Sequence, residues 1–561
     1  MSSERSAEHH YVSLLIASFR KYPEAPAFLP YIGRDDAWER VTYREIEQRL
    51  VATQTYWRDT LAPLNLQPRD VVGFWLTGRK LSDLLNTIAV CALGYVPQYF
   101  SGYFGNSSVV LDLLAKSGGK VFIVDPNFEA QVTNVRSDGS SVPRFRTLEY
   151  GDMTRLVSQS TAPEKLILDL ASVAPVARDD VAALFHSSGT TGGTPKIIPS
   201  TFKMITSMVG GKWPNILVRP ADGRQPVMNT LGNVAHIGSI HLFLGSIHVG
   251  ACMVQTSSMD IPDKEFLNIV RMHRLSTVVL YATFLGRLIN SAQQDPEMKD
   301  ALKSIDQIIH TGVALHKEEE EWAYANGIKI VTSYGTTETA PLLKSTTESP
   351  ILYPIPGANP VFLPYQDQDK SADGVQLYEV VVPSTADDCP PPEMCGEDGY
   401  YHTNDLFEKV GDGWVYRGRG GDWIKILGGF CDTKNVEDTV RKLCSNLVHD
   451  VVMVGTGRMY PVLIVESAAS GLSEEDRKRI SQEIVDRTAE FNRRLFIHER
   501  VEDPKRVFVV EKGTLPRTKE KGNIRYVFLG FVRRAVVNVH PRRAATEELF
   551  EKELDLVSER A

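Results

Sequence analysis

Short apolar runs rich in β-branched residues alternate with amphipathic helical segments along most of this chain. RDVVGFWL and KVFIVDP are such runs near the N-terminus, and HRLSTVVLYAT, IDQIIHTG and GIKIVTSYG follow in the middle. Apolar residues at helical spacing lie between them, for example in VTYREIEQRLVATQTYWRDTL. Strands that alternate with helices predict an α/β architecture, in which functional groups gather in the loops beyond the carboxyl ends of the strands.

The helical pattern fades from about Val361. VQLYEVVVP, GYYHTNDLFEKV and GWVYRGRG predict short antiparallel strands that would form a small β-subdomain. Beyond GRGGD at residues 418–422 the chain predicts a helix, a strand pair, a long helix with Ser473 as its N-cap, and a further strand. The glycines of GRGGD would let the backbone swivel. We therefore expect a large N-terminal domain of α/β subdomains plus the β-subdomain, residues 1–419, and a smaller mobile α/β C-terminal domain, residues 420–561.

Composition narrows the class of protein. The chain has 561 residues, of which 42% are hydrophobic and 24% are charged, and its net charge is −8. These values are ordinary for a globular protein and exclude a disordered, collagen-like or disulfide-stapled chain. A mildly acidic chain is not built as a general nucleic-acid binder. The N-terminus has no secretory pattern, and no run reaches the roughly 18 apolar residues of a membrane span, so we expect a cytoplasmic protein with no membrane or nucleic-acid partner.

The six cysteines are scattered and form no CxxC pair. This arrangement is typical of reduced intracellular thiols rather than of a disulfide framework. Cys389 and Cys395 are close in sequence, but CPPPEMC is a Pro-rich loop, and we favour free thiols there over a metal site or a disulfide.

The strongest chemical signal is HSSGTTGGTPKIIPS, residues 186–200. Backbone N–H groups and hydroxyls in such a loop can surround a polyphosphate, and the ammonium of Lys196 adds positive charge. The segment is not a Walker loop, because Pro195 precedes the lysine and the required GK[ST] is absent. By composition alone, a linker without a ligand is the alternative.

Three further segments carry polar groups of the same kind. In SYGTTETAP, residues 333–341, Tyr334 can stack on a base and Glu338 offers a hard oxygen ligand for Mg²⁺. Within residues 400–422, Asp405 can accept two hydrogen bonds from a ribose diol, and Arg419 can bind the diol or a phosphate. LPRTKEKGNIRY, residues 515–526, places lysines on a Gly-bearing loop that can reach a distant site. Taken singly, SYGTTETAP and LPRTKEKGNIRY are more typical of a polar turn and a solvated basic loop, and for residues 400–422 the alternative is a β-turn acid with a surface arginine.

Together these four segments, in this order and at these separations, resemble the adenylate-forming superfamily of acyl-CoA synthetases, peptide-synthetase adenylation domains and luciferases. Weaker matches in VTYREIE, CALGYVPQYFS, HTGVAL and ILGGFCDTKNVED extend the resemblance over nearly the whole chain. The overall residue pattern of the chain and its KGNIR segment are most similar to the adenylation domain of fungal carboxylic-acid reductases. The implied activity is ATP-dependent conversion of a carboxylic acid to an acyl-AMP with release of pyrophosphate, followed by transfer to the phosphopantetheine thiol of a carrier.

The resemblance implies roles for the matching residues. Lys521 would contact the carboxylate and the α-phosphate, Glu338 would hold Mg²⁺ beside Thr337, and His236 would line the acid pocket, with a hydrogen-bonded core histidine as the alternative for His236. The residues implied to bind ATP are Ser187, Ser188, Gly189, Thr190, Thr191, Gly192, Lys196, Gly312, Val313, Ala314, Tyr334, Gly335, Thr336, Asp405, Tyr416 and Arg419. The implied cofactors are ATP and Mg²⁺, with a carrier phosphopantetheine or CoA as the thiol acceptor.

The chain departs from the family pattern at four places. The phosphate loop holds one residue more than the usual SGTTGxPK, and Asn404 stands where the TGD motif has glycine. Gly421 occupies a place where a hinge Asp or Lys is common. The usual Gly-Lys order is reversed as Lys521-Gly522, which makes Lys519 a second candidate for the catalytic lysine. None of these departures removes a charged group that the chemistry needs.

The substrate and the acceptor are the least constrained features. No aspartate that could pair with an α-ammonium lies around His236, so we favour a small-molecule acid without an α-amine, aryl first and aliphatic second. After Arg525 we see no room for a carrier or a reductase, so a carrier domain would act in cis or in trans from outside this sequence, and residues 547–559 predict a helix that would lead toward it. An acyl-CoA ligase that uses free CoA, or an inactive nucleotide-binding module, are the alternative functions.

Overall fold

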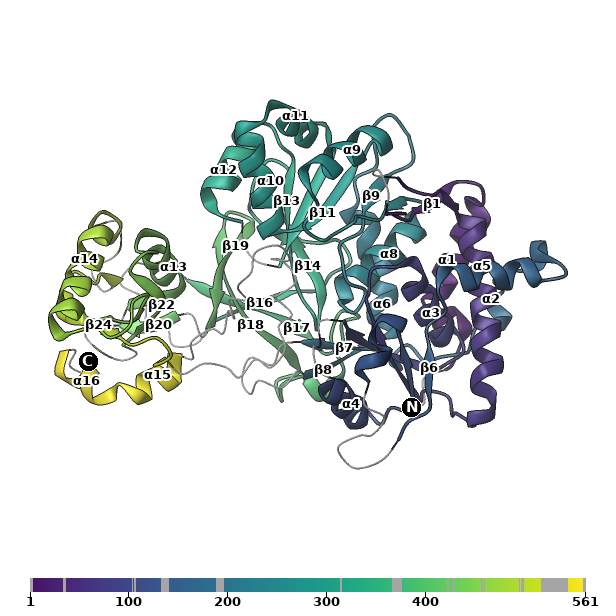
Figure 1. Cartoon of the computed structure of the whole chain (residues 1–561), viewed down its shortest axis with the longest axis horizontal. Helices are drawn as coiled ribbons and strands as arrows, with labels where there is room; N and C mark the ends of the chain where they lie inside the picture. The colour runs from purple at the N-terminus through teal and green to yellow at the C-terminus, as the bar shows by residue number, and fades with distance from the viewer. Residues whose placement is uncertain are drawn as a thin grey trace.

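The computed structural model describes residues 4–33, 37–102, 104, 107–132, 141–187, 196–312, 315–365, 376–420, 423–426, 429–455, 458, 460–493, 495, 499–515 and 543–557. Two large sheets and a small antiparallel sheet form the body of the molecule, and a smaller α/β unit lies at one end of it (Figure 1). The α/β class predicted from the alternating runs is confirmed.

A nine-stranded sheet runs in the order β15-β14-β13-β12-β11-β9-β10-β1-β2. Its strands are β1 (Pro26–Leu29), β2 (Val41–Thr42), β9 (Val227–Asn229), β10 (Cys252–Val254), β11 (Thr277–Tyr281), β12 (Gln307–Thr311), β13 (Ile330–Thr336), β14 (Ala340–Lys344) and β15 (Tyr353–Pro354). The central strands from β13 to β1 are parallel, and antiparallel strands β14, β15 and β2 extend the edges. The three strands predicted in the middle of the chain are β11, β12 and β13.

A six-stranded sheet runs in the order β6-β5-β3-β4-β7-β8. Its strands are β3 (Val71–Leu76), β4 (Val96–Ser101), β5 (Val121–Val124), β6 (Arg144–Arg146), β7 (Val181–Ser187) and β8 (Lys196–Thr201). All of them are parallel except β8, which pairs with β7 in the antiparallel sense. Parallel strands covered on both faces are apolar without alternation, and the runs VVGFWL and VFIV show this pattern in β3 and β5.

Helices pack on both large sheets. They are α1 (Val12–Lys21), α2 (Tyr43–Leu61), α3 (Leu81–Ala92), α4 (Ser107–Lys116), α5 (Tyr150–Gln159), α6 (Phe202–Thr206), the π-helical turn η6 (Ser207–Lys212), α7 (Trp213–Ile216), α8 (Ile237–Val249), α9 (Asp263–His273), α10 (Ala282–Gln294), α11 (Pro296–Ser304) and α12 (Lys317–Ala325). α2 begins at a capping box, in which the Thr42 hydroxyl accepts from Glu45 N–H and the Glu45 carboxylate accepts from Thr42 N–H. One hydrophobic core joins α1, α2, α3 and α8 to both sheets, and a second lies between the nine-stranded sheet and α9–α12, which lie together at the top of Figure 1.

The predicted β-subdomain is a four-stranded antiparallel sheet in the order β16-β17-β18-β19. Its strands are β16 (Val361–Pro364), β17 (Leu377–Pro383), β18 (Tyr400–Val410) and β19 (Gly413–Arg419). Val380, Val382 and Phe407 pack with Leu342 and Leu343 of β14, so this sheet shares a core with the edge of the nine-stranded sheet. The loop between β17 and β18 contains a 3₁₀ turn, η7 (Pro392–Met394).

The C-terminal unit has its own sheets and its own cores. Its elements are β20 (Trp423–Ile426), β21 (Gly429–Asp432), α13 (Thr433–Leu443), β22 (Val448–Val454), β23 (Val462–Ser467), α14 (Glu474–Asn492), β24 (Val507–Val510), α15 (Arg543–Leu549) and α16 (Glu551–Val557). Ser473 caps α14 as predicted, because its hydroxyl accepts from Asp476 N–H. The helix predicted near the end of the chain is a pair of short helices that packs on this unit: Arg543 donates to Met453 O at 2.9 Å, and Leu554 is buried.

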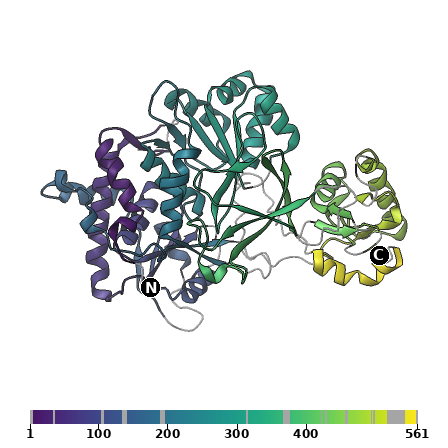
Figure 2. The same ribbon diagram turned by 180° about the vertical axis from the view of Figure 1, so that it is seen from behind.

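The body and the C-terminal unit are separated along most of their length (Figure 2). Lys442 of α13 forms an ion pair with Glu318 of α12 at 2.9 Å, and both side chains are mostly exposed. β19 ends at Arg419 and β20 begins at Trp423, so GRGGD lies between the two parts, and a division at residue 420 stays a prediction. None of the described helices combines the length and the apolar character needed to span a lipid bilayer.

Candidate functional site

The carboxyl ends of parallel strands from both large sheets meet around the segment before α8. Asn233 Nδ2 donates to the carbonyl of Thr77, which follows β3, and to Ser101 Oγ at the end of β4, both at 3.1 Å. β7 is parallel to β4, so Ser187 at its carboxyl end lies at the same edge. Ligands of α/β sheets bind at this kind of edge, and the predicted phosphate-binding loop begins here.

Ser187 and Lys196 form the last pair of the β7–β8 ladder. That ladder therefore holds the two ends of the predicted phosphate loop in register, and residues 188–195 between them lie outside the described residues. Lys196 is exposed. The exposed ammonium of Lys196 at one end of this loop is a group that can bind a polyphosphate.

His236, Tyr281 and Gly312 lie next to one another. His236 caps α8, its Nδ1 accepting from Gly238 N–H at 3.2 Å, and its ring stands edge-on to Tyr281 with centroids 6.2 Å apart. Gly312 has φ +94°, and a Cβ at this position would lie 3.1 Å from the Tyr281 ring. His236 is an exposed residue. Protein atoms around its imidazole nevertheless remove part of its hydration, and this desolvation lowers the pKa of the ring. His236 therefore lies beside Tyr281 and Gly312, and its role in the acid pocket stays a prediction.

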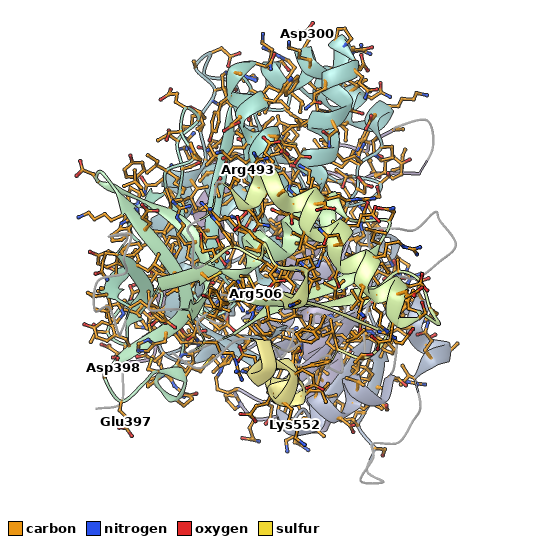
Figure 3. All side chains as sticks on the ribbon, turned by 90° about the vertical axis from the view of Figure 1, so that its left-hand side faces the viewer. Asp300, Glu397, Asp398, Arg493, Arg506 and Lys552 are labelled. Carbon is orange, nitrogen blue, oxygen red and sulfur yellow. The ribbon has the colours of Figure 1, made fainter. Side chains whose placement is uncertain are left out.

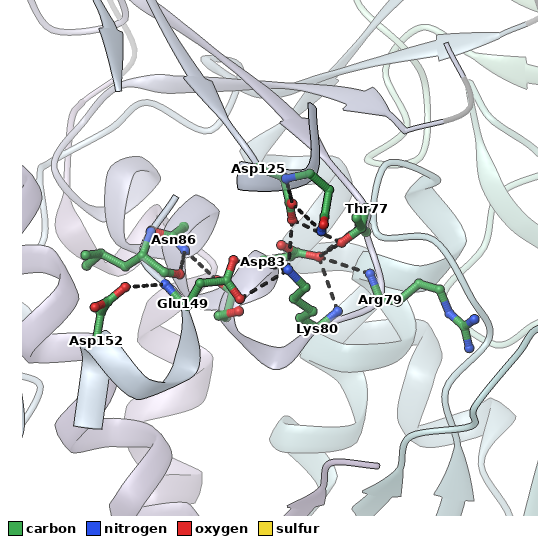
Figure 4. A network of polar contacts seen from close by, with 12 residues as sticks. Thr77, Arg79, Lys80, Asp83, Asn86, Asp125, Glu149 and Asp152 are labelled. Carbon is green, nitrogen blue, oxygen red and sulfur yellow. Dashed lines mark hydrogen bonds and ion pairs between the residues drawn. The ribbon is translucent and has the colours of Figure 1, made fainter. Parts of the chain in front are cut away.

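Two buried carboxylates hold the turn that contacts Asn233 (Figure 4). Asp83 Oδ2 accepts from three successive backbone N–H groups, from Gly78 at 2.9 Å to Lys80 at 3.2 Å. Asp125 accepts from Lys80 Nζ at 3.0 Å. Burial raises the pKa of Asp83 to about 6. Gly78 has φ +77°, and a Cβ there would lie 2.0 Å from Asn233 Oδ1, so only glycine fits this approach.

SYGTTETAP forms a β-hairpin in which β13 ends at Thr336 and β14 begins at Ala340. A Cβ on Gly335 would lie 2.4 Å from the carbonyl oxygen of Ala340, so the two strands can approach this closely only at a glycine. Thr336 Oγ1 accepts from the N–H groups of Glu338 and of the residue after it, both at 3.2 Å. Ala340 itself has φ +57°, an uncommon conformation for alanine. The resulting tight turn carries Thr337 and Glu338.

Asp405 is the centre of a buried polar cluster drawn from β13, β18 and β19. Tyr334 Oη donates to its Oδ2 at 2.8 Å, and Arg419 Nε and Tyr416 Oη approach its Oδ1 at 3.2 Å and 3.4 Å. The Asp405 side chain is only 4% exposed. A carboxylate offers about four acceptor sites, so a diol that brings two hydroxyls requires one of the present donors to move. Of the three contacts, the one from Tyr416 is the longest.

The charges in this cluster influence one another. Burial raises the pKa of Asp405, and the guanidinium of Arg419 opposes that effect. Burial by itself would lower the pKa of Arg419, but the neighbouring carboxylate outweighs it and raises that pKa. Burial and the Asp405 charge raise the pKa of Tyr334 well above its usual value, so its hydroxyl stays protonated and can donate.

Asn404, where the family pattern has glycine, has φ +58°. This left-handed conformation is one that Asn adopts more readily than other side-chain-bearing residues, so the backbone geometry that a glycine would supply is kept. Asn404 N–H donates to Glu379 Oε1 at 2.9 Å, and His402 Nδ1 lies 2.9 Å from Glu379 Oε2. The departure therefore leaves Asp405, the next residue, in place.

Sequence reasoning missed a buried ion pair behind the hairpin. Lys212 Nζ donates to the carbonyl of Pro341 at 2.9 Å and lies 3.5 Å from Asp388 Oδ2. Asp388 also accepts from Asn359 N–H at 3.0 Å, and both charged side chains have almost no exposure. Burial lowers the pKa of Lys212 and Asp388 opposes this. No local signal could have paired GGKWP with ADDCP, because only the tertiary fold brings them together.

His241 on α8 was also missed as a site candidate. It is 2% exposed, and within the described part of the chain neither ring nitrogen has a hydrogen-bond partner. Burial, followed by the charges of Lys212 and His236, lowers its pKa to about 3. His241 is therefore a neutral imidazole close to the predicted acid pocket.

The described residues can hold Mg²⁺ only together with ligands that the substrate and water supply. Across the described ranges, no group of three or more His, Cys, Asp or Glu side chains is arranged to hold a metal ion. The Glu338 carboxylate forms no ion pair within those ranges. Mg²⁺ is usually bound through one or two carboxylates together with substrate phosphates and water, and a single unpaired carboxylate agrees with that arrangement.

Some predicted site residues lie outside the described residues, and nothing in the geometry above depends on them. They are Ser188, Gly189, Thr190, Thr191, Gly192, Val313, Ala314 and Lys521, together with the second lysine candidate, Lys519.

Two family models match the chain. Residues 16–369 match the model described as AMP-binding enzyme, and residues 427–529 match the AMP-binding enzyme C-terminal domain. The chain is also similar to the AMP-binding domain-containing enzyme iboA of Amanita muscaria (strain Koide BX008), with 29% identity over 495 residues, which are 86% of this chain and 92% of that protein. A second relative, the adenylate-forming reductase stbB of Stachybotrys bisbyi, is 26% identical over 273 residues, which are 46% of this chain and 23% of that protein.

Among solved structures, the chain is similar to o-succinylbenzoate CoA synthetase from Bacillus subtilis in complex with its acyl-adenylate intermediate. The TM-score is 0.64, and the alignment covers 96% of this chain and 100% of that one. At 17% identity this likeness shows the fold alone. The shared fold consists of a large N-terminal domain and a small C-terminal domain.

Proposed function

The chain belongs to the AMP-binding enzyme family of the adenylate-forming superfamily, and from this premise we propose that it activates a carboxylic acid with ATP to give an acyl-AMP and pyrophosphate. In this step a carboxylate oxygen bonds to the α-phosphorus as the bond to the pyrophosphate oxygen breaks. No covalent enzyme nucleophile is needed. The task of the chain is to hold two anions together and to offset their repulsion.

The observation that carries the proposal is the Asp405 cluster. Asp405 contacts Tyr334 of the SYGTTETAP hairpin and Arg419 of the neighbouring strand, so two of the four predicted segments meet at one buried carboxylate. A carboxylate supported by a guanidinium suits a ribose diol, and the aromatic ring of Tyr334 offers a face for a base. In this proposal Tyr416 shifts away to leave room for the diol.

The phosphates would extend from the ribose toward the β7–β8 hairpin. Ser187, Lys196 and the loop between them would bind the β- and γ-phosphates. Glu338 would hold Mg²⁺, which supplies charge neutralisation at the phosphate oxygens, and Thr337 would lie beside it in the catalytic site. Lys521 would contact the α-phosphate and the acid carboxylate from the C-terminal domain.

The acid would bind against His236, Tyr281 and Gly312. An aromatic ring beside a glycine supports a flat substrate, and no carboxylate of this group is available to pair with an α-ammonium. We therefore favour an aryl acid without an α-amine. An aliphatic acid is the second choice.

The acyl group would then pass to a thiol. The thiolate sulfur bonds to the acyl carbon and AMP leaves with the bonding electrons. The phosphopantetheine of a carrier is the favoured acceptor, and free CoA is the alternative. The C-terminal domain would turn between the two steps, and the exposed Lys442–Glu318 pair is worth only about 0–1 kcal/mol, too little to prevent this.

ATP–pyrophosphate exchange tests the adenylation step. The panel should contain benzoic, cinnamic, aryl 2-oxo, fatty and amino acids, each with and without CoA and with and without a chelator. Exchange that depends on an aryl acid and on Mg²⁺, without a CoA thioester, is the expected result. Formation of a CoA thioester would mean that free CoA, and not a carrier, is the thiol acceptor. ATP binding without exchange for any acid would favour an inactive nucleotide-binding module.

Matched lysine variants test the role of the C-terminal loop. Lys521→Ala should lower exchange by about 10²-fold or more, the usual effect of losing one transition-state charge contact, while ATP affinity changes little. Lys519→Ala is the control and should keep most of the activity. The reverse result would move the catalytic role to Lys519.

A further inference from the structure

Cys389 and Cys395 lie in van der Waals contact in the loop between β17 and β18. Their sulfur atoms are 3.4 Å apart, with the 3₁₀ turn η7 between the two residues in sequence. Cys389 is fully buried, whereas Cys395 is partly exposed. The four other cysteines are all buried. The pair therefore combines a thiol that solvent can reach with a second thiol directly behind it.

The outer end of this loop is at the edge of the molecule. Figure 3 shows the side chains of Glu397 and Asp398, which follow Cys395 closely in sequence, at the periphery and directed outward. Burial, and then the adjacent Cys395 thiol, raise the pKa of Cys389 to about 12. A thiol with a raised pKa is the poorer nucleophile, because the thiolate is the reactive form. An oxidant from solvent would therefore meet Cys395 first.

We propose that Cys389 and Cys395 are a modification site at which a peroxide forms a reversible disulfide, and that formation of this bond shifts the SYGTTETAP hairpin through the contacts of Asp388 and Lys212. The Cys395 sulfur attacks one peroxide oxygen, the O–O bond breaks, and a sulfenic acid and water (or an alcohol) result. The Cys389 sulfur then attacks the Cys395 sulfur and a second water leaves. Two thiols lose two electrons and two protons in total, and the peroxide is reduced by the same two electrons.

The route to the hairpin consists of consecutive contacts. A disulfide requires the sulfurs to approach to about 2.05 Å, so the pair must close by about 1.4 Å from its present separation. Asp388 is the residue before Cys389, and its carboxylate is bound by Asn359 and paired with Lys212. Lys212 in turn binds the carbonyl of Pro341, the last residue of the hairpin motif. Close-packed interiors transmit shifts of this size rather than absorbing them.

The chemical part is tested on the full chain by peptide mass mapping. Hydrogen peroxide, followed by alkylation under denaturing conditions, should leave Cys389 and Cys395 unalkylated on one peptide that has lost two hydrogen atoms. Dithiothreitol should restore both thiols. Cys91, Cys252, Cys431 and Cys444 serve as internal controls and should remain alkylated. A sulfinic acid on Cys395 with Cys389 still alkylated, or equal oxidation of all six thiols, would overturn the proposal.

The transmission is tested by hydrogen exchange, which is independent of the proposed activity. Oxidation should change the exchange rate of the amides in residues 333–344 at least several-fold. Cys395→Ser, a change at a partly exposed position, should abolish that response, and Cys395→Ala should behave in the same way. An unchanged exchange rate in the fully oxidised protein would refute transmission through Lys212, whether or not the chain adenylates an acid.

Discussion

Tyr334 Oη donates to Asp405 Oδ2 across 2.8 Å, so a hydroxyl from the nine-stranded sheet is bound by a carboxylate from the small antiparallel sheet. This bond fixes the relative position of two loops that are far apart in the sequence. It also joins the two groups that the proposed nucleotide site would use, the aromatic ring of Tyr334 and the carboxylate of Asp405.

The first prediction concerns this pair. Asp405→Ala should weaken ATP binding at least about tenfold, because it removes an acceptor shared by Tyr334 and Arg419, and hydrogen bonds to charged groups contribute about 1.5–3 kcal/mol. Tyr334→Phe keeps the ring and should cost only about 1 kcal/mol of folding stability, with a smaller loss of affinity. Calorimetric titration with ATP and thermal unfolding measure the two effects. Equal losses of affinity in both variants would argue against a direct role of the carboxylate.

The second prediction concerns Lys212 and Asp388. Lys212→Met or Asp388→Leu alone should destabilise the fold by about 3–5 kcal/mol, because each leaves a buried charge without its partner. The double variant removes both charges and should be more stable than the sum of the single losses implies. Urea unfolding of the four proteins gives the coupling energy as a double-mutant cycle. Additive losses would mean that the two charges do not interact.

The third prediction tests the left-handed residue before Asp405. Asn404→Gly should leave stability nearly unchanged, because glycine adopts φ +58° without strain. Asn404→Val should cost about 1–2 kcal/mol, because a β-branched side chain clashes in this conformation. Thermal unfolding of the two variants provides the comparison. A valine variant as stable as the glycine variant would show that the backbone can relax here.

The fourth prediction is a pH dependence. Glu379, opposed by burial and assisted by Asp398, raises the pKa of His402. Protonated His402 therefore contributes stability that is complete below its unfolded pKa of about 6.5 and is lost as the pH rises through the higher folded value. Replacement by His402→Gln should lower stability more at about pH 5.5 than at about pH 9. Urea midpoints that shift by the same amount at both pH values would contradict the ion pair.

The local sequence pattern was sufficient to predict most of the helices and strands. The runs that became β3, β5, β11, β12 and β13 each contain consecutive apolar residues with β-branched side chains, and Ser473 stands directly before the helix that it caps. Such features depend on a few consecutive residues, so they can be identified without a structure. The four motif segments were identified for the same reason, because each is a short run of a recognisable composition.

Contacts between segments that are far apart in the sequence could not be predicted from local patterns. The sequence named Tyr334, Asp405 and Arg419 as separate candidates, and it gave no indication of the buried cluster in which Tyr416 also occupies the carboxylate. Lys212 and Asp388 carry no motif, and their charges are held in the interior only because Pro341 and Asn359 supply further hydrogen bonds. CPPPEMC predicted a loop, but only the folded structure shows that its two sulfurs are in contact and that Cys389 Sγ lies 3.7 Å from the carbonyl oxygen of Val382 in β17.

The sequence by itself therefore determined the α/β class, the order of the elements and the residue types available for chemistry, because periodicity and composition act over short stretches of chain. The tertiary structure alone decided which of those residues meet. Contacts such as Asn233 with the ends of β3 and β4, or His236 with Tyr281, depend on the sum of many packing interactions across two sheets, and no short segment encodes that sum.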